Sequence, residues 1–383
     1  MRFINQPSIV NVVPNHLMDY PTSSNINYLW SFGSLSGMML ALQIITGILL
    51  AMHYTPHIAL AFNSVEHIMR DVNAGWLIRY LHANGASMFF IVVYIHIGRN
   101  LFFKTYSFPR LVLWYTGIII FFLMMATAFM GYVLPWGQMS FWAATVITNL
   151  FTAIPVVGKA AAQWLWGGYG VDNPTLNRFF SLHYLLPFAL AGLAIVHLNL
   201  LHVSGSTNPL GLYKNTDKIG FYPYFYIKDL LAFLSMLTIF AFLVFFMPNY
   251  LGHPDNYILA NSLVTPAHLV PEWYFLPFYA ILRSIPNKIG GLICMVLAIA
   301  VFFIIAILDK NESRLNVYSN ISSYSSFFYF INFILLMWLG GKPVEAPYVM
   351  LAQILVIFNF AWIFIWLPFI SLIQSSTLDS ENL

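Results

Sequence analysis

Four histidines in two apolar stretches are the residues of this sequence best placed to do chemistry. His82 and His96 lie fourteen positions apart (96 − 82 = 14), and His183 and His197 repeat the spacing (197 − 183 = 14). In an α-helix, fourteen residues return a side chain to nearly the same face, about 21 Å along the axis. Each pair therefore presents two imidazoles from one helix face at two depths.

These histidines have several chemical interpretations. A single histidine in an apolar helix is either a hydrogen-bonded core residue or a proton relay. Four at two matched depths favour metal binding, but zinc takes four protein ligands, or three and a water. A porphyrin supplies four equatorial nitrogens and leaves two axial positions, so two histidines per depth predict two non-covalent haem b groups, each with two histidine ligands.

Membrane-spanning helices are the elements that position these histidines. Hydrophobic residues make up 60% of the 383 residues and charged residues 8%, whereas soluble domains carry about 25% charged residues. About 20 apolar residues cross a bilayer. The sequence therefore predicts an all-α polytopic membrane protein with eight spans, at Phe32–Met52, Tyr80–Phe102, Leu111–Leu134, Phe179–Leu201, Leu230–Met247, Ile289–Leu308, Ser322–Gly341 and Ala346–Ile373.

An even number of spans places both chain ends on one side, here called the inner side. A small excess of Lys and Arg on that side agrees with the positive-inside rule. The two longest loops, Pro135–Arg178 and Pro248–Lys288, then face the outer side, and long ordered loops usually carry function. We divide the chain into a haem-binding part (residues 1–210), whose first four spans form a four-helix bundle, and a part with the remaining spans (residues 211–383).

The direction of the spans pairs the histidines. One span lies between the two that carry them, so both run in the same direction through the membrane. His82 and His183 therefore share the outer depth, and His96 and His197 share the inner depth. Each depth has the two imidazoles that one haem requires.

Glycines in the first and third spans repeat the same spacing. Gly33 and Gly47 are fourteen residues apart (47 − 33 = 14), as are Gly117 and Gly131 (131 − 117 = 14). Because these spans run the opposite way, Gly47 and Gly131 fall at the outer depth and the other two at the inner depth. A flat macrocycle needs backbone without a Cβ where it touches a helix, although glycines also serve ordinary helix packing in membranes.

Two arginines extend the pattern. Arg79 precedes His82 by three residues, and Arg99 follows His96 by three, so each arginine lies on its histidine's face. Guanidinium groups there could pair with the carboxylates of a haem. The alternative is an interfacial arginine that extends its charge toward water.

The rest of the composition excludes other sites. The single cysteine, Cys294, leaves no CxxC metal site, no CxxCH haem attachment and no ligand set for an iron–sulfur cluster. The formal net charge of +3 without a basic run gives no reason to expect nucleic acid as a partner.

Several short motifs carry a family resemblance. With the four histidines, the segments Gly131-Tyr132, Gly137-Gln138-Met139-Ser140 and Pro271-Glu272-Trp273-Tyr274 resemble the cytochrome b family of the respiratory ubiquinol–cytochrome c reductase. The similarity covers essentially the whole chain. In the chloroplast form the second histidine pair is one residue wider and the spans are split between two chains, so this sequence resembles the mitochondrial form. That implies the mitochondrial inner membrane, with several spans and both termini on the matrix side.

The resemblance implies a quinol-oxidising site on the outer side. Its pocket positions match Phe129, Tyr132, Met139, Ile147, Glu272 and Tyr279. A carboxyl in an apolar pocket has its pKa raised by desolvation, which suits Glu272 to accept a proton from quinol. The alternative for Pro271–Tyr274 is an interfacial helix start with aromatic anchors.

The resemblance also implies a quinone-reducing site on the inner side. It matches His202, Lys228 and Asp229, with Ser206 and Asn208 beside them. An imidazole and a carboxylate can hydrogen-bond the two quinone carbonyls and deliver protons. Without the resemblance, a solvated ion pair at the membrane interface is an equally good interpretation of Lys228-Asp229.

The same resemblance implies the cofactors and partners. The outer haem is the low-potential group and the inner haem the high-potential one, because moving a charge against the membrane potential costs about 2.3 kcal/mol per 100 mV. Ubiquinol and ubiquinone are the substrates. The implied partners are the Rieske iron–sulfur protein, a membrane-anchored c-type cytochrome, other complex III subunits, a second copy of the chain and membrane lipids.

Two other classes of protein explain the sequence less completely. A secondary transporter would place its ionisable residues near the membrane midplane, but these histidines lie at two depths. A haem-binding anchor for a soluble dehydrogenase would explain the histidines and not the two long outer loops with Glu272. An optical spectrum separates the three classes. The cytochrome b interpretation predicts two haems, a haem-binding anchor predicts one, and a transporter predicts none.

Ala143 departs from the family pattern, which usually has glycine there. The extra methyl group would enter the quinol-oxidising pocket. We therefore expect weakened binding of bulky methoxyacrylate-type inhibitors, with quinol turnover largely kept. Inhibitor titration of the Ala143→Gly variant against the parent protein checks this, and equal sensitivity of the two would contradict it.

Overall fold

The computed structural model describes residues 18–211, 217–309 and 320–373. In this part of the chain, 8 helices are long and apolar enough to cross a membrane, which confirms the predicted spans. They are α2 (Phe32–Ala51), α4 (Gly75–Phe102), α5 (Leu111–Val133), α8 (Asn173–Ser204), α9 (Tyr224–Phe246), α11 (Lys288–Leu308), α12 (Asn320–Gly340) and a last helix, Tyr348–Ile373, that contains α13 (Tyr348–Ala361) and a π-helical turn (Trp362–Trp366).

Three helices begin well before the residue that the hydrophobic pattern indicates. α4 starts at Gly75, α8 at Asn173 and α9 at Tyr224, because helical structure continues past the apolar segment into sequence that contains polar residues. At the start of α8, Asp172 forms a capping box with Thr175, and Pro174 occupies the first turn. Both features stabilise a helix start.

The inner-side loops meet at one end of the bundle, as predicted. Strand β1 (Pro21–Ser23) pairs antiparallel with β2 (Lys218–Gly220), which joins the N-terminal segment to the loop before α9. Lys104, after α4, forms a buried ion pair with Asp309, after α11, at 3.2 Å. Arg110 Nε donates to the Gly205 carbonyl at 2.9 Å. The chain ends, and the inner-side charges Arg2, Lys214, Lys310 and Arg314, lie outside the described residues.

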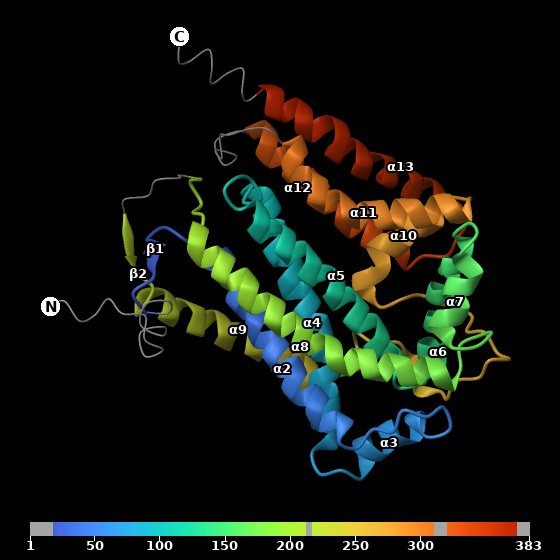
Figure 1. Cartoon of the computed structure of the whole chain (residues 1–383). Coiled ribbons are helices and arrows are strands. Elements are labelled where there is room, and N and C mark those ends of the chain that lie inside the picture. Colours follow the sequence, from blue (N-terminus) through green and yellow to red (C-terminus); the bar gives the residue numbers. More distant parts are fainter. Residues whose placement is uncertain (1–17, 212–216, 310–319, 374–383) are drawn as a thin grey trace.

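The outer-side loops interlock at the opposite end (Figure 1). Gly137 forms a β-bridge with Leu259, and Ser140 Oγ donates to Asn256 Oδ1 at 3.0 Å. These loops contain short helices that the sequence analysis did not predict: α3 (Ala61–Arg70), α6 (Gln138–Asn149), α7 (Gly158–Trp166) and α10 (Leu276–Ser284). Each is too short to register as a span.

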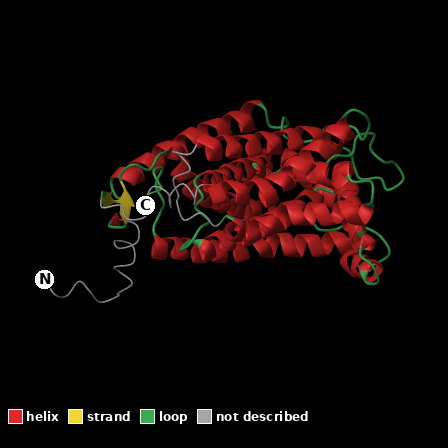
Figure 2. Ribbon diagram, turned by 90° about the horizontal axis from the view of Figure 1, so that it is seen from above, coloured by secondary structure: helices red, strands yellow, loops and turns green. Residues whose placement is uncertain are grey.

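The first four long helices form one bundle. α2 packs on α4, α5 packs on α8, and α2 also contacts α8. α9 lies against α2 and α4, while α10 joins α11, α12 and α13 into a second group. Figure 2 shows the long helices lying side by side along the molecule, with the β1–β2 pair at one end. A core of buried apolar residues, including Met39, Phe90, Phe240 and Ile281, joins the two groups.

Candidate functional site

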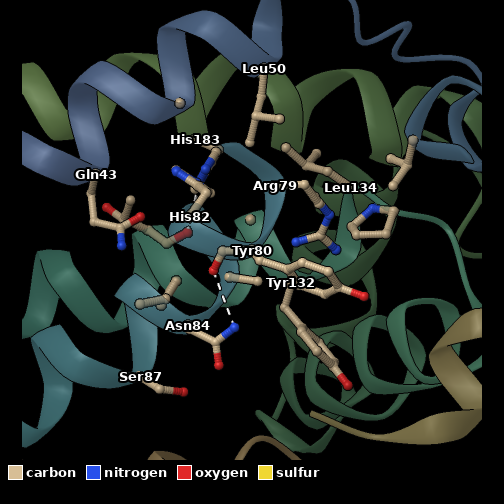
Figure 3. Close-up of a pocket in the computed structure, with 18 of the residues that line it drawn as sticks. Gln43, Leu50, Arg79, Tyr80, His82, Asn84, Ser87, Tyr132, Leu134 and His183 are labelled. Atoms are coloured by element: carbon tan, nitrogen blue, oxygen red, sulfur yellow. Dashed lines mark hydrogen bonds between the residues drawn. The ribbon is translucent and has the colours of Figure 1, made fainter. Parts of the chain in front are cut away.

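The outer histidines face each other inside the bundle. The ring centroids of His82 on α4 and His183 on α8 are 6.2 Å apart and their planes are nearly perpendicular, at 86°. Both line a cavity of about 300 Å³ (Figure 3). A metal ion bound to one nitrogen of each ring at about 2.0 Å, an ordinary metal–imidazole length, would place the ring centres about 6 Å apart. The observed separation fits two imidazoles that bind one metal ion.

The Nδ1 atoms of both rings are already engaged. His82 Nδ1 lies 2.9 Å from Thr46 Oγ1 on α2. His183 Nδ1 lies 2.8 Å from the Thr127 carbonyl on α5, which can only accept, so this nitrogen is the protonated one. Metal-binding histidines are typically held in this way through the nitrogen that does not bind the metal.

The inner histidines have a similar environment. His197 Nδ1 lies 2.9 Å from Thr116 Oγ1 on α5, and His96 and His197 are near enough to interact electrostatically. His96 Nδ1 has a longer contact, 3.5 Å, with Arg99 Nη2. The Nε atom of Arg99 is buried without a hydrogen-bond partner, which fits a guanidinium prepared for an anion such as a haem carboxylate.

Each of the four predicted glycines faces one histidine ring. A Cβ on Gly33 would lie 3.4 Å from His96, on Gly117 3.2 Å from His197, and on Gly47 3.1 Å from His82, in each case from ring Cε1. A Cβ on Gly131 would overlap the ring of His183. The glycines therefore make room for the imidazoles themselves, a reason that the sequence analysis did not give.

Charged and polar groups share the outer cavity with His82 and His183. Arg79, Tyr132 and Glu272 all line it, and Figure 3 shows Arg79 beside Tyr132. Burial raises the pKa of Glu272 to about 7, while a hydrogen bond from Tyr132 and the charge of Arg79 limit the rise. A carboxyl group with this pKa can accept and release a proton near neutral pH.

Other residues predicted for the quinol site lie outside this cavity's lining. Phe129 packs edge-on against Phe179. Met139 is fully buried on α6, where Ile147 and the buried Ala143 also lie. The Tyr279 hydroxyl donates to the Leu269 carbonyl at 3.5 Å, and its ring lies under Arg283.

The inner-side residues lie where α8 ends and α9 begins. His202 stacks on Tyr20 with 4.5 Å between ring centroids. Asp229 accepts a hydrogen bond from Ser34 at 2.9 Å, and Lys228 donates to the Ile26 carbonyl at 2.6 Å. The N-terminal segment and the start of α2 thus hold both charged residues of this predicted site in place.

Ser206 and Asn208 occupy the loop after α8. The backbone of Ser206 hydrogen-bonds Tyr20, the residue that stacks on His202. Asn208 is buried, and its side chain caps the turn by accepting from the Leu210 amide at 3.0 Å. These hydrogen bonds hold the loop that follows His202 in its conformation.

Sequence reasoning missed the residues that orient the histidines, chiefly Thr46, Thr116 and Thr127. A signal for two of them was present, since a Thr-Gly pair occurs at 46–47 and again at 116–117, beside two of the predicted glycines. Among the described residues, no group of three or more His, Cys, Asp and Glu could hold a metal ion.

Comparison with known protein families agrees with the site. Residues 17–205 match the family described as cytochrome b/b6/petB, and residues 259–360 match cytochrome b(C-terminal)/b6/petD. The chain is 58% identical to cytochrome b of Phytophthora megasperma over 366 residues, covering 96% of each chain. It is 56% identical to cytochrome b of Chondrus crispus over 382 residues, covering 99% of each.

A solved structure shares the whole fold. The structure, titled "Hyperthermophilic respiratory Complex III", contains a chain that matches with a TM-score of 0.91 and 33% identity, covering 96% of this chain and 97% of that chain. The predicted family is therefore confirmed. This chain belongs to the cytochrome b family.

Proposed function

We propose that the chain is the core membrane subunit of a respiratory quinol–cytochrome c oxidoreductase and holds two haem b groups. His82 and His183 would bind the outer haem, and His96 and His197 the inner one. The proposal rests mainly on one observation. The imidazole rings of His82 and His183 face each other inside a bundle of helices long and apolar enough to cross a membrane, with 6.2 Å between their ring centroids. When bound, each haem supplies an iron that accepts and releases one electron at a time.

The surrounding residues have separate tasks in this proposal. The groups that hold Nδ1 leave Nε2 of His82, His183 and His197 free to bind iron. Arg79 and Arg99 would neutralise the haem carboxylates, for which the unpartnered Nε of Arg99 gives support. The four glycines let the neighbouring helices approach the imidazoles closely.

Glu272 is the proposed proton acceptor in quinol oxidation. Its carboxyl group lines the outer cavity, and the pKa raised by burial permits it to take a quinol proton near pH 7. Tyr132 orients the carboxyl group through their hydrogen bond. The family resemblance adds Phe129, Met139, Ile147 and Tyr279 as walls of this site.

On the inner side, His202 and Asp229 would hydrogen-bond a quinone and deliver its protons. Lys228 interacts electrostatically with Asp229, and Ser206 and Asn208 shape the adjacent loop. The contacts of Asp229 with Ser34 and of His202 with Tyr20 support this role, because they hold an acid and an imidazole at the same end of the bundle.

The proposal includes a location and partners. The similarity to a respiratory Complex III chain supports assembly with other complex III subunits. More specifically, we propose a Rieske iron–sulfur protein, a membrane-anchored c-type cytochrome and a second copy of this chain, in the mitochondrial inner membrane with both termini on the matrix side. The single cysteine agrees with an iron–sulfur centre held by another subunit.

A reduced-minus-oxidised optical spectrum of the purified complex tests the haem assignment. We expect two b-type bands in the parent protein and loss of the inner-haem band in the His96→Leu variant, because the iron loses one of its two axial ligands. His67→Leu is the control, since His67 lies on α3 with a side chain 55% exposed. One band or none in the parent protein would refute the proposal.

Alanine substitution of the four glycines should give a graded loss of haem. Gly131→Ala overlaps His183 and should be the most damaging, by about 1–3 kcal/mol of overpacking, whereas Gly33→Ala makes an ordinary contact. Haem content measured by pyridine haemochrome is the readout. Gly37→Ala on α2, where a Cβ meets nothing within 4 Å, is the control, and equal losses in all variants would contradict the packing argument.

Quinol oxidation should fall at low pH through protonation of Glu272. Below its pKa of about 7, the carboxylate fraction drops about tenfold per pH unit, and the rate should follow. Glu272→Gln should remove this dependence, and Tyr132→Phe should move it to higher pH because a hydrogen bond that lowers the pKa is lost. Steady-state rates between pH 5 and pH 9 measure this, and a parent-like pH profile in Glu272→Gln would exclude the role.

A further inference from the structure

Two threonines occupy equivalent places beside the two metal sites. Thr46 on α2 and Thr116 on α5 each directly precede a glycine that faces a histidine. Their hydroxyl oxygens lie at the same distance, 2.9 Å, from His82 Nδ1 and His197 Nδ1. One histidine at each depth therefore has a threonine hydroxyl on its Nδ1 atom.

The hydrogen bonds of these hydroxyls fix the position of the imidazole proton. The Thr46 hydroxyl donates to the Leu42 carbonyl at 2.7 Å, and the Thr116 hydroxyl donates to the Leu113 carbonyl at 2.8 Å. Because a hydroxyl has one proton, each oxygen must accept from the imidazole. Nδ1 is then protonated, and Nε2 carries the lone pair that a metal ligand needs.

The second histidine at each depth lacks such a hydroxyl contact. His183 Nδ1 bonds the backbone carbonyl of Thr127 at 2.8 Å, while the Thr127 hydroxyl donates to Leu123 at 2.7 Å. His96 Nδ1 contacts Arg99. Thr238 on α9 provides a matched threonine, because its exposed side chain also donates to a carbonyl of its own helix, that of Leu234, at 2.8 Å.

We propose that Thr46 and Thr116 are positioning residues, whose hydroxyls accept a hydrogen bond from Nδ1–H of His82 and His197 in addition to the backbone and thereby set the reduction potentials of the outer and inner haem separately. The inference rests on the proposed haem ligation. A hydrogen bond accepted from Nδ1–H strengthens electron donation by the imidazole and stabilises the oxidised iron. Loss of the hydroxyl therefore raises the potential of the haem beside it.

The test is a redox titration of the purified complex, followed optically and by electron paramagnetic resonance. Thr46→Val should raise the potential of the outer haem only, and Thr116→Val that of the inner haem only. The backbone of Gln43 and Leu113 also bonds these imidazoles, so one acceptor remains in each variant. We expect a threefold to tenfold change in the reduction equilibrium, where tenfold equals about 59 mV for one electron.

Thr238→Val is the matched control and should leave both potentials unchanged, because the Thr238 hydroxyl bonds only its own helix among the described contacts. Parent-like potentials and resonance spectra in both Thr46→Val and Thr116→Val, with both haems present, would overturn the inference but leave the proposed haem ligation intact. An equal shift in Thr238→Val would also overturn it, since the shift would then not depend on a hydroxyl beside a histidine.

If a valine variant fails to take up haem, a serine substitution at the same position shows whether the missing hydroxyl is the cause. If Thr46→Val lacks the outer haem, Thr46→Ser, which keeps the hydroxyl, should restore it. Equal failure of Thr46→Ser would count against the hydroxyl. Absence of both haems from the parent protein would instead refute the proposed function.

Discussion

Each histidine ring of the four-helix bundle lies against a glycine of the neighbouring helix, and the rest of the structure depends on this contact. Gly47 and Gly33 of α2 face histidines of α4, and Gly131 and Gly117 of α5 face histidines of α8. These are also the helix pairs that pack most extensively. Because an added Cβ on Gly47, Gly117 or Gly131 would press on a ring, these glycines set how closely the helices approach and how the imidazoles point inward.

The same helices that make room for the rings also hold them. Hydrogen bonds from α2 and α5 reach Nδ1 of His82, His183 and His197. In a membrane interior an unpaired polar group is costly, so an imidazole there needs a partner. Because these hydrogen bonds are made by Nδ1, Nε2 of the same rings stays free to bind a metal ion.

At the outer end, one cavity joins a buried arginine, a tyrosine and a carboxyl group to the His82–His183 pair. The residues come from α4, α5, α8 and the loop before α10, so the cavity exists only when the two outer loops interlock. The bridge between Gly137 and Leu259 and the bond from Ser140 to Asn256 make that connection. The His82–His183 pair and the Glu272 carboxyl group are therefore held beside one cavity.

Much of this protein follows from its sequence alone. The eight spans, the loops that share a side and the depth at which each histidine and glycine lies all follow from apolar length and helical periodicity, which are local properties. The boundaries of α4 and α8 and the short helices of the outer loops do not, because capping and loop packing extend helices beyond their apolar segments.

Only the tertiary structure decided how the site residues meet. Thr46, Thr116 and the Thr127 carbonyl are held against histidines by the approach of separate helices, and Tyr132 meets Glu272 across 140 residues of chain (272 − 132 = 140). Periodicity places a side chain on a helix face and at a depth. The direction of a hydrogen bond and the burial that raises the pKa of Glu272 depend on which faces pack together, and that is a property of the folded bundle.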